Sequence, residues 1–169
     1  HHTNRQCTGS RNALPFRFVH TADIHLDSPL RSLALRNAEL AELIGDASRQ
    51  ALAAIIDLCL DEQVDALIIA GDLYDGDQTS MKTARFLAGQ LERLHQAGIR
   101  TYLIKGNHDA LSKIAKELVL PDTVKIFGGN AEAIEIIAGG LPIALHGLSF
   151  AKPHAPETLL PRYRPPVLD

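Results

Sequence analysis

Three short polar segments of the chain carry residues of the kinds that bind divalent metal ions. They lie at residues 20–25, 71–75 and 106–109. Together they supply carboxylates, a carboxamide and imidazoles but no thiolate, a donor set that suits Mn²⁺, Fe²⁺ or Zn²⁺. Any one of them alone could be an ordinary loop, because Asp, Asn and Gly are common in loops. Three such segments together favour a metal site.

The residues within these segments differ in what they could do at a metal centre. Asp23 and His25 are separated by one residue and can point into the same cleft from an extended loop. Asp72 has two oxygens and could bridge two ions about 3.5–4 Å apart, the spacing of dinuclear hydrolases. Asn107 could bind the second ion through a neutral oxygen, which adds no repulsion toward a charged phosphate. His108 would then be free to act on the substrate.

Each polar segment directly follows a run of residues that is typical of a β-strand, and longer runs with helical periodicity separate these strands. The expected strands cover residues 16–20, 64–70 and 100–105, and the expected helices cover residues 38–63, about 79–97 and 110–118. Thr79 is expected to cap the second helix and Gly98 to end it. This order predicts an α/β fold with a parallel sheet and helices on both faces. The three polar segments should then meet at the carboxyl edge of the sheet.

The second half of the chain has a different character. Shorter apolar runs at residues 124–127, 132–137 and 143–146 are separated by glycine-rich turns and predict further strands. Five of the last 17 residues are proline, which can continue neither a sheet nor a helix. We therefore expect a tag remnant, linker or disordered head at 1–13, a folded domain at 14–152 and a proline-rich tail at 153–169.

Length and composition favour one globular domain without a basic nucleic-acid-binding surface. The 169 residues are 46% hydrophobic and 22% charged, enough for a core without disulfides. Lys and Arg number 17 against 20 Asp and Glu, a formal charge of −3, whereas a basic nucleic-acid footprint needs a pI above about 9. Cys7 and Cys59 form no disulfide or zinc pattern, which indicates a reducing compartment, most simply the cytoplasm. The longest uncharged run, 136–151, is interrupted by Gly and Pro and is too short to span a membrane.

The order of the three motifs resembles that of the calcineurin-like metallophosphoesterase superfamily. The motifs are Asp23-x-His25, Gly71-Asp72 and Gly106-Asn107-His108-Asp109. The fuller strings at residues 16–30 (FRFVHTADIHLDSPL) and 70–75 (AGDLYD) are closer still to the SbcD-type DNA repair exonucleases. This resemblance covers about residues 16–150. It implies a layered sandwich with helices around central β-sheets.

The resemblance also implies roles for the site residues. By this likeness Asp23 and His25 hold the first metal, Asp72 bridges, Asn107 holds the second metal, and His108 protonates the leaving oxygen or stabilises the transition state. The implied cofactors are two divalent ions, Mn²⁺ first, with Fe²⁺ or Zn²⁺ as alternatives. The implied substrate is DNA, with an SMC-like coiled-coil ATPase and a second copy of the chain as partners. Two alternatives stay open: another phosphoesterase, acting on cyclic nucleotides, phosphoproteins or small monoesters, or a non-catalytic DNA-binding fragment.

The sequence departs from the family pattern at its end. That pattern continues with a further histidine and a G-H-x-H motif, and neither is present. His146 is disfavoured as a substitute, because it matches the segment before the missing histidine, and His154 is expected to be solvated. We therefore expect the N-terminal part of such a domain, incomplete on its C-terminal side, with a weak second metal and little activity by itself. Four residues would then lack part of their covering layer: Ile134, Ile136, Ile143 and Leu145.

Other polar residues near the motifs have ordinary interpretations as well. A structural role is favoured over metal ligation for His20. Asp27 and Asp75 could equally orient ligands or take part in caps and turns. For Lys105 a solvated strand end is favoured over contact with a phosphate, and His95 is expected on the surface of a helix.

Overall fold

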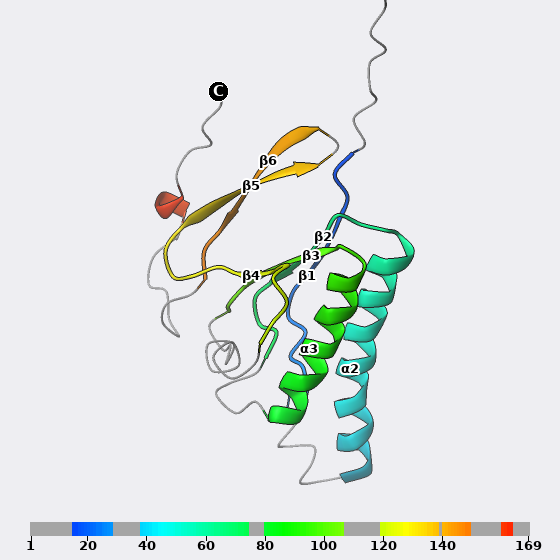
Figure 1. Ribbon diagram of the computed structural model, residues 1–169. Coiled ribbons are helices and arrows are strands. Elements are labelled where there is room, and N and C mark those ends of the chain that lie inside the picture. Colours follow the sequence, from blue (N-terminus) through cyan, green and yellow to red (C-terminus); the bar gives the residue numbers. More distant parts are fainter. Residues whose placement is uncertain are drawn as a thin grey trace, which may run out of the picture.

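A four-stranded parallel sheet forms the centre of the protein (Figure 1). The computed structural model describes residues 15–28, 38–74, 80–106, 119–138, 140–149 and 160–163. The strands are β1 (Phe18–Thr21), β2 (Ala66–Ala70), β3 (Arg100–Ile104) and β4 (Val124–Ile126), in the order β1-β2-β3-β4. In register, His20 pairs with Ile68, and Ile68 pairs with Tyr102. This arrangement confirms the predicted parallel α/β sheet and brings the ends of β1, β2 and β3 to one edge.

Two long helices lie side by side on one face of the sheet (Figure 1). They are α2 (Ala38–Asp61) and α3 (Met81–Gln96). Ser80 caps α3 by accepting a hydrogen bond from the Thr83 N–H at 3.2 Å, so the prediction of Thr79 as the cap was wrong by one residue. After α3 the chain turns at Gly98, whose φ of 74° is the left-handed stop that the sequence predicted. The helix expected at 110–118 lies outside the described residues.

The core beneath these helices follows from the periodicity of their sequences. Apolar residues of α2 and α3 meet the strands in one buried cluster, which includes Leu52, Ile56, Leu67, Leu87, Leu91 and Leu103. Successive residues of a strand point to opposite faces, so Leu103 joins this cluster and its neighbour Tyr102 does not. None of the helices in the described ranges is long and apolar enough to cross a membrane.

A β-hairpin covers the opposite face of the sheet, where the sequence predicted helices. Its antiparallel strands are β5 (Glu132–Ala138) and β6 (Leu141–Gly147), and a short 3₁₀ helix follows at Leu160–Arg162. Tyr102 and Phe127 pack against Ile136 in a second core cluster. Both helices of the described region therefore share one face, and the expectation of helices on both faces was wrong for this region.

One inward-facing residue of the hairpin is better covered than the sequence indicated. Ile136 is only 6% exposed, and its neighbour Ile137, which points outward, is 78% exposed. The other three residues expected to lack cover, Ile134, Ile143 and Leu145, are partly buried against the same cluster. The central sheet therefore covers Ile136, whereas the partial burial of the other three is compatible with the prediction.

Candidate functional site

The loops that follow β1 and β2 are joined by a ladder of backbone hydrogen bonds. The N–H of Asp23 donates to the carbonyl of Gly71 at 3.2 Å, and the N–H of His25 donates to the carbonyl of Asp72 at 3.1 Å. One residue further, the N–H of Leu26 donates to Leu73 at 2.8 Å. This ladder places the backbones of three predicted metal ligands side by side at the carboxyl edge of the sheet.

The same three residues adopt an uncommon backbone conformation. Asp23, His25 and Asp72 have φ angles of 53°, 47° and 48°, in the left-handed region that residues with a Cβ rarely adopt. Such conformations cost of order 1–3 kcal/mol each and persist where the surroundings fix them, often at functional sites. Three of the five non-glycine residues with positive φ in the described ranges are predicted ligands. Backbone strain is therefore concentrated where the sequence placed the chemistry.

The side chains of these residues leave lone pairs available. Among the described residues, neither Nδ1 of His25 nor Oδ1 of Asp72 has a hydrogen-bond partner, although both atoms are buried. Buried polar atoms are nearly always satisfied, so these two unpartnered atoms are candidates for binding a metal ion. The Asp23 carboxylate is 73% exposed and lies 4.0 Å from Nε2 of His25. Oxygen and imidazole donors of this kind fit a divalent metal ion.

The complete set of predicted ligands is not tested by the described residues. Asn107, His108 and Asp75 lie outside them. Within the described ranges, no group of three or more His, Cys, Asp or Glu side chains is placed to hold a metal ion. The convergence of four ligands on two ions therefore stays a prediction. The structure supports one part of it, the close approach of the loops after β1 and β2.

Gly106 brings the end of β3 against Asp72. A Cβ atom on Gly106 would lie 2.6 Å from the backbone nitrogen of Asp72 and 2.7 Å from its carboxyl carbon, closer than real Cβ contacts allow. Only glycine permits this approach. Gly106 is the first residue of the third polar segment, which therefore begins beside Asp72. The sequence analysis included Gly106 in its motif but did not assign it this packing role.

Ser149 anchors the start of the third polar segment and was not singled out from the sequence. Its side chain is buried, and its Oγ accepts a hydrogen bond from the Lys105 N–H at 2.8 Å while donating to the Phe127 carbonyl. Its own N–H donates to the carbonyl of Gly128 at 2.8 Å. The segment after β6 is thereby fixed to the ends of β3 and β4. A serine in an apolar stretch was the only signal in the sequence.

Asp27 is held by residues of both helices, Arg49 of α2 and Thr83 of α3. Arg49 donates to both carboxylate oxygens, with Nε 2.7 Å from Oδ1, and the Thr83 hydroxyl donates to Oδ2 at 2.5 Å. Burial alone would raise the pKa of Asp27, but these hydrogen bonds and the charge of Arg49 outweigh it and lower the pKa. The carboxylate therefore fixes the loop to the helices instead of contacting His25 directly.

Four further histidines were weighed as ligands or surface residues. His20 is exposed on β1. His95 is half-buried, and its Nδ1 lies 3.0 Å from the hydroxyl of Thr123, so the expectation of a plain surface residue was wrong. His146 lies on β6 opposite Ala133, and its Nε2 is buried without a partner among the described residues. His154 lies outside the described residues.

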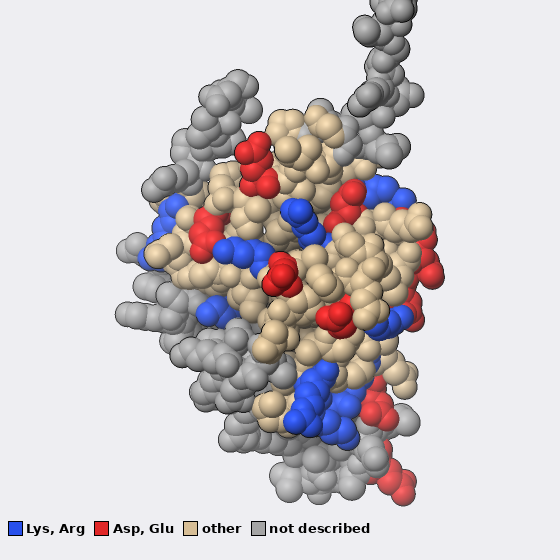
Figure 2. All heavy atoms as spheres, in the orientation of Figure 1, with Lys and Arg blue, Asp and Glu red and all other residues tan. Residues whose placement is uncertain are grey.

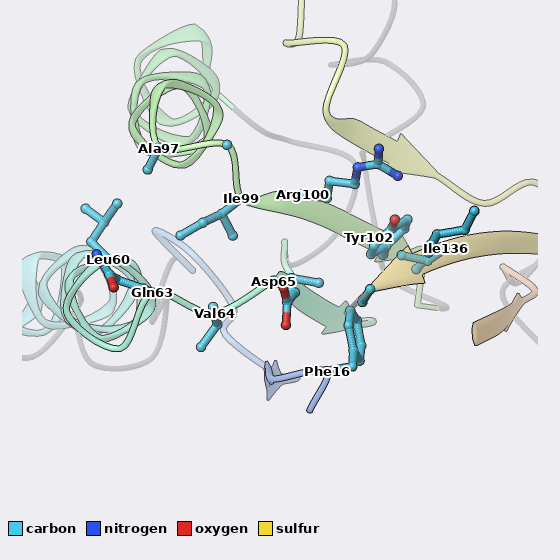
Figure 3. A pocket seen from close by; sticks show the side chains of 14 residues that line it. Phe16, Leu60, Gln63, Val64, Asp65, Ala97, Ile99, Arg100, Tyr102 and Ile136 are labelled. Atoms are coloured by element: carbon cyan, nitrogen blue, oxygen red, sulfur yellow. The ribbon is translucent and has the colours of Figure 1, made fainter. Parts of the chain in front are cut away.

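A pocket of about 420 Å³ lies at the other edge of the sheet, where the strands begin (Figure 3). Phe16 precedes β1, Asp65 precedes β2, and Arg100 begins β3, while Ile136 of the hairpin closes one end. None of the predicted ligands that the structure describes, Asp23, His25 and Asp72, lines this pocket. It is therefore separate from the candidate metal site.

Acidic and basic side chains are interspersed on the face shown in Figure 2. This distribution agrees with the formal charge of −3. Exposed pairs such as Lys125 with Glu132 at 2.7 Å contribute to the mixture. Attraction of a nucleic acid would therefore depend on local charge at a site and not on the overall charge of the chain.

Comparison with known proteins finds relatives in the family that the three motifs resemble. The calcineurin-like phosphoesterase family model matches residues 16–166. The chain is 34% identical over 149 residues to the uncharacterized metallophosphoesterase YhaO of Bacillus subtilis, covering 87% of this chain and 36% of that protein. It is 36% identical over 107 residues to the SbcD component of the nuclease SbcCD of Rhodobacter capsulatus, covering 62% of this chain and 24% of that protein.

An archaeal protein is also similar to this chain. The DNA double-strand break repair protein Mre11 of Methanocaldococcus jannaschii is 26% identical over 150 residues, covering 87% of this chain and 38% of that protein. The chain thus spans between 24% and 38% of the length of these three relatives. The resemblance drawn from the three motifs is confirmed.

Proposed function

Since this chain belongs to the calcineurin-like phosphoesterase family, a family of hydrolases, we propose that it contributes a two-metal site that hydrolyses phosphodiester bonds in DNA. The observation that carries the proposal is the backbone ladder that sets Asp23 and His25 beside Asp72. The lone pairs of His25 and Asp72 that lack partners among the described residues support it.

Each residue has a role in this proposal. Asp23 and His25 would hold the first divalent ion, Asn107 would hold the second, and Asp72 would contribute to both. Bound divalent ions supply positive charge to the phosphate and a water molecule that is acidic near neutral pH. His108 donates a proton to the leaving 3′-oxygen, which is general acid catalysis. We propose Mn²⁺ as the ion because oxygen donors predominate in the set.

The choice of DNA as substrate rests on the names of the relatives. Two of the three are named as part of a nuclease and as a double-strand break repair protein, and the third is named as an uncharacterized metallophosphoesterase. An SMC-like ATPase and a second copy of the chain are proposed as partners. The buried free thiol of Cys59 supports the proposed cytoplasmic location, because free thiols persist in reducing compartments.

The proposal is tested by substrate preference in the presence of Mn²⁺. The 169-residue chain, and the longest polypeptide that its gene encodes, would be assayed on linear duplex DNA, a chromogenic phosphodiester and a chromogenic phosphomonoester. Metal-dependent cleavage of DNA and the diester, abolished by Asp72→Ala and retained by Asp57→Ala on the surface of α2, would support the proposal. Cleavage of the monoester alone would indicate another phosphoesterase, and DNA binding without hydrolysis would indicate a non-catalytic protein.

A further inference from the structure

The loop that carries Asp23 and His25 ends in a tight turn. The N–H of Ser28 donates to the carbonyl of His25 at 3.0 Å, which closes the turn His25–Ser28. Asp27 lies inside this turn with a φ of 55°, a third left-handed residue in the same loop. Within the described residues, the backbone ladder to the loop after β2 extends to Leu26. Side-chain contacts of Asp27 then join the far end of the turn to the helices.

The side chain of Asp27 supplies those contacts. Its carboxylate accepts hydrogen bonds from Arg49 of α2 and Thr83 of α3, and its N–H donates to the Ser48 hydroxyl at 3.1 Å. The Asp27 side chain is only 21% exposed and that of Arg49 23%, so the pair is well shielded from water. Arg49 is itself held 5.2 Å from the ring centre of Phe86. These contacts join the turn to both helices at once.

We propose that Asp27 is a positioning residue for the metal site. By fixing the turn His25–Ser28 to α2 and α3, it holds Asp23 and His25 in the left-handed conformation that sets them beside Asp72. It does so through the backbone, because Arg49 and Thr83 occupy its carboxylate oxygens. This inference rests on the proposed function, since it takes Asp23 and His25 to be metal ligands.

The chain offers a matched control for this ion pair. Asp57 of α2 accepts a hydrogen bond from Arg93 of α3 at 2.6 Å, so it is another Asp–Arg pair that involves the helices. Its side chain is 57% exposed, and no predicted ligand takes part in the pair. Asp57→Ala therefore removes an ion pair without touching the turn that follows His25.

The test measures Co²⁺ binding and hydrogen exchange in the same set of variants. Co²⁺ titration, followed by its visible absorption, reports the affinity and ligand environment of the site. Exchange at the amides of His25 and Leu26 in the metal-free chain reports whether the ladder stays closed. We expect Asp27→Ala to weaken Co²⁺ binding about 10-fold or more, as loss of a residue that orients metal ligands does, and to speed exchange at both amides. Asp57→Ala should change neither measurement.

Two further variants show that the effect passes through the helices. The double variant Asp27→Ala/Arg49→Ala should bind Co²⁺ no more weakly than Asp27→Ala, because the two residues act as one unit. Thr83→Val, which removes the hydroxyl at nearly constant volume, should weaken binding, and Thr83→Ser should restore it. Thr83→Val also keeps the test decisive if Asp27→Ala fails to fold.

The two proposals fail in different ways. If the unaltered chain does not bind Co²⁺, the proposed metal site is wrong and this inference falls with it. If the unaltered chain binds Co²⁺ but Asp27→Ala and Thr83→Val match Asp57→Ala in affinity and exchange, the positioning role alone is wrong.

Discussion

Replacing Gly106 with alanine should disable the candidate site through one backbone contact. The added Cβ would lie 2.6 Å from the backbone nitrogen of Asp72, whereas real Cβ atoms essentially never approach closer than 3.0 Å. Asp72 or the end of β3 must therefore move by about 0.4 Å, the difference between these distances. The side-chain Oδ1 of Asp72 lies nearer still, at 2.1 Å, and a change of rotamer could move it. The clash with the backbone nitrogen cannot be relieved in that way.

The size of the effect follows from this clash. Overpacking of a well-packed region typically costs about 1–3 kcal/mol of unfolding free energy. A displacement of about 1 Å at a site can lower a rate by about 10²-fold, and Asp72 is the proposed bridge between two ions. For Gly106→Ala we expect a loss of about 1–3 kcal/mol in urea unfolding. Mn²⁺-dependent diester hydrolysis should fall by at least about 10-fold, as should Co²⁺ affinity.

Gly89, in the middle of α3, provides the matched control. A Cβ atom there would meet nothing within 4 Å, and its φ is not positive. Gly89→Ala should therefore leave metal binding and hydrolysis unchanged. It should also stabilise the helix by up to about 1 kcal/mol, since alanine is the better helix former. Equal Co²⁺ affinity and equal hydrolysis in the two variants would refute the packing argument.

Four further predictions concern metal binding, anchoring, pH and activity. In the longest polypeptide that the gene encodes, Asp72→Ala should lose both bound metal and turnover. His108→Ala should keep metal and lose about 10²–10⁴-fold in turnover, as metal analysis beside the diester assay would show. Ser149→Ala should lower the urea unfolding free energy by about 1–3 kcal/mol, because the part-buried Lys105 N–H loses its acceptor and the buried Phe127 carbonyl loses its donor. A loss below about 0.5 kcal/mol would contradict this. In the metal-free chain, the ion pair of Asp27 should stabilise the fold at pH values above 3.8, the usual pKa of an aspartate. This contribution should be lost as the pH falls through the lower pKa that Asp27 has in the folded state. The difference in unfolding free energy from Asp27→Asn should therefore be smaller at pH 3 than at pH 7. The 169-residue chain by itself should cleave linear duplex DNA slowly, because its four predicted ligands fall short of the roughly eight to ten donors that two bridged ions need; rates equal to those of a longer form would contradict this.

The order of elements could be predicted because each element carries its own local signal. The helical periodicity at 38–63 became α2 at Ala38–Asp61, and the apolar run at 100–105 became β3 at Arg100–Ile104. Parallel pairing follows from the alternation of strands and helices. That pairing alone places the segments after β1 and β2 at one edge, which is why the sequence could predict where Asp23 and Asp72 would meet.

The face on which each helix packs could not be predicted in the same way. Right-handed crossovers place successive helices on one face when each new strand adds on the same side, and on opposite faces when the direction reverses. The observed order β1-β2-β3 is the first case. No local signal in the sequence specifies the direction of this growth. The hairpin that covers the other face is likewise held by distant contacts, such as Tyr102 with Ile136.

The backbone strain at the candidate site depends on contacts that sequence patterns do not encode. Asp and His enter the left-handed region more readily than most residues, but still as a minority of cases. What holds Asp23 there is a hydrogen bond to Gly71, and what holds the turn after His25 is Arg49 on a distant helix. Natural sequences tend to break local rules at functional sites, where distant contacts offset the cost. Strain that coincides with the predicted ligands therefore supports a site at this edge of the sheet, because residue type alone leaves the left-handed region a minority conformation for Asp and His.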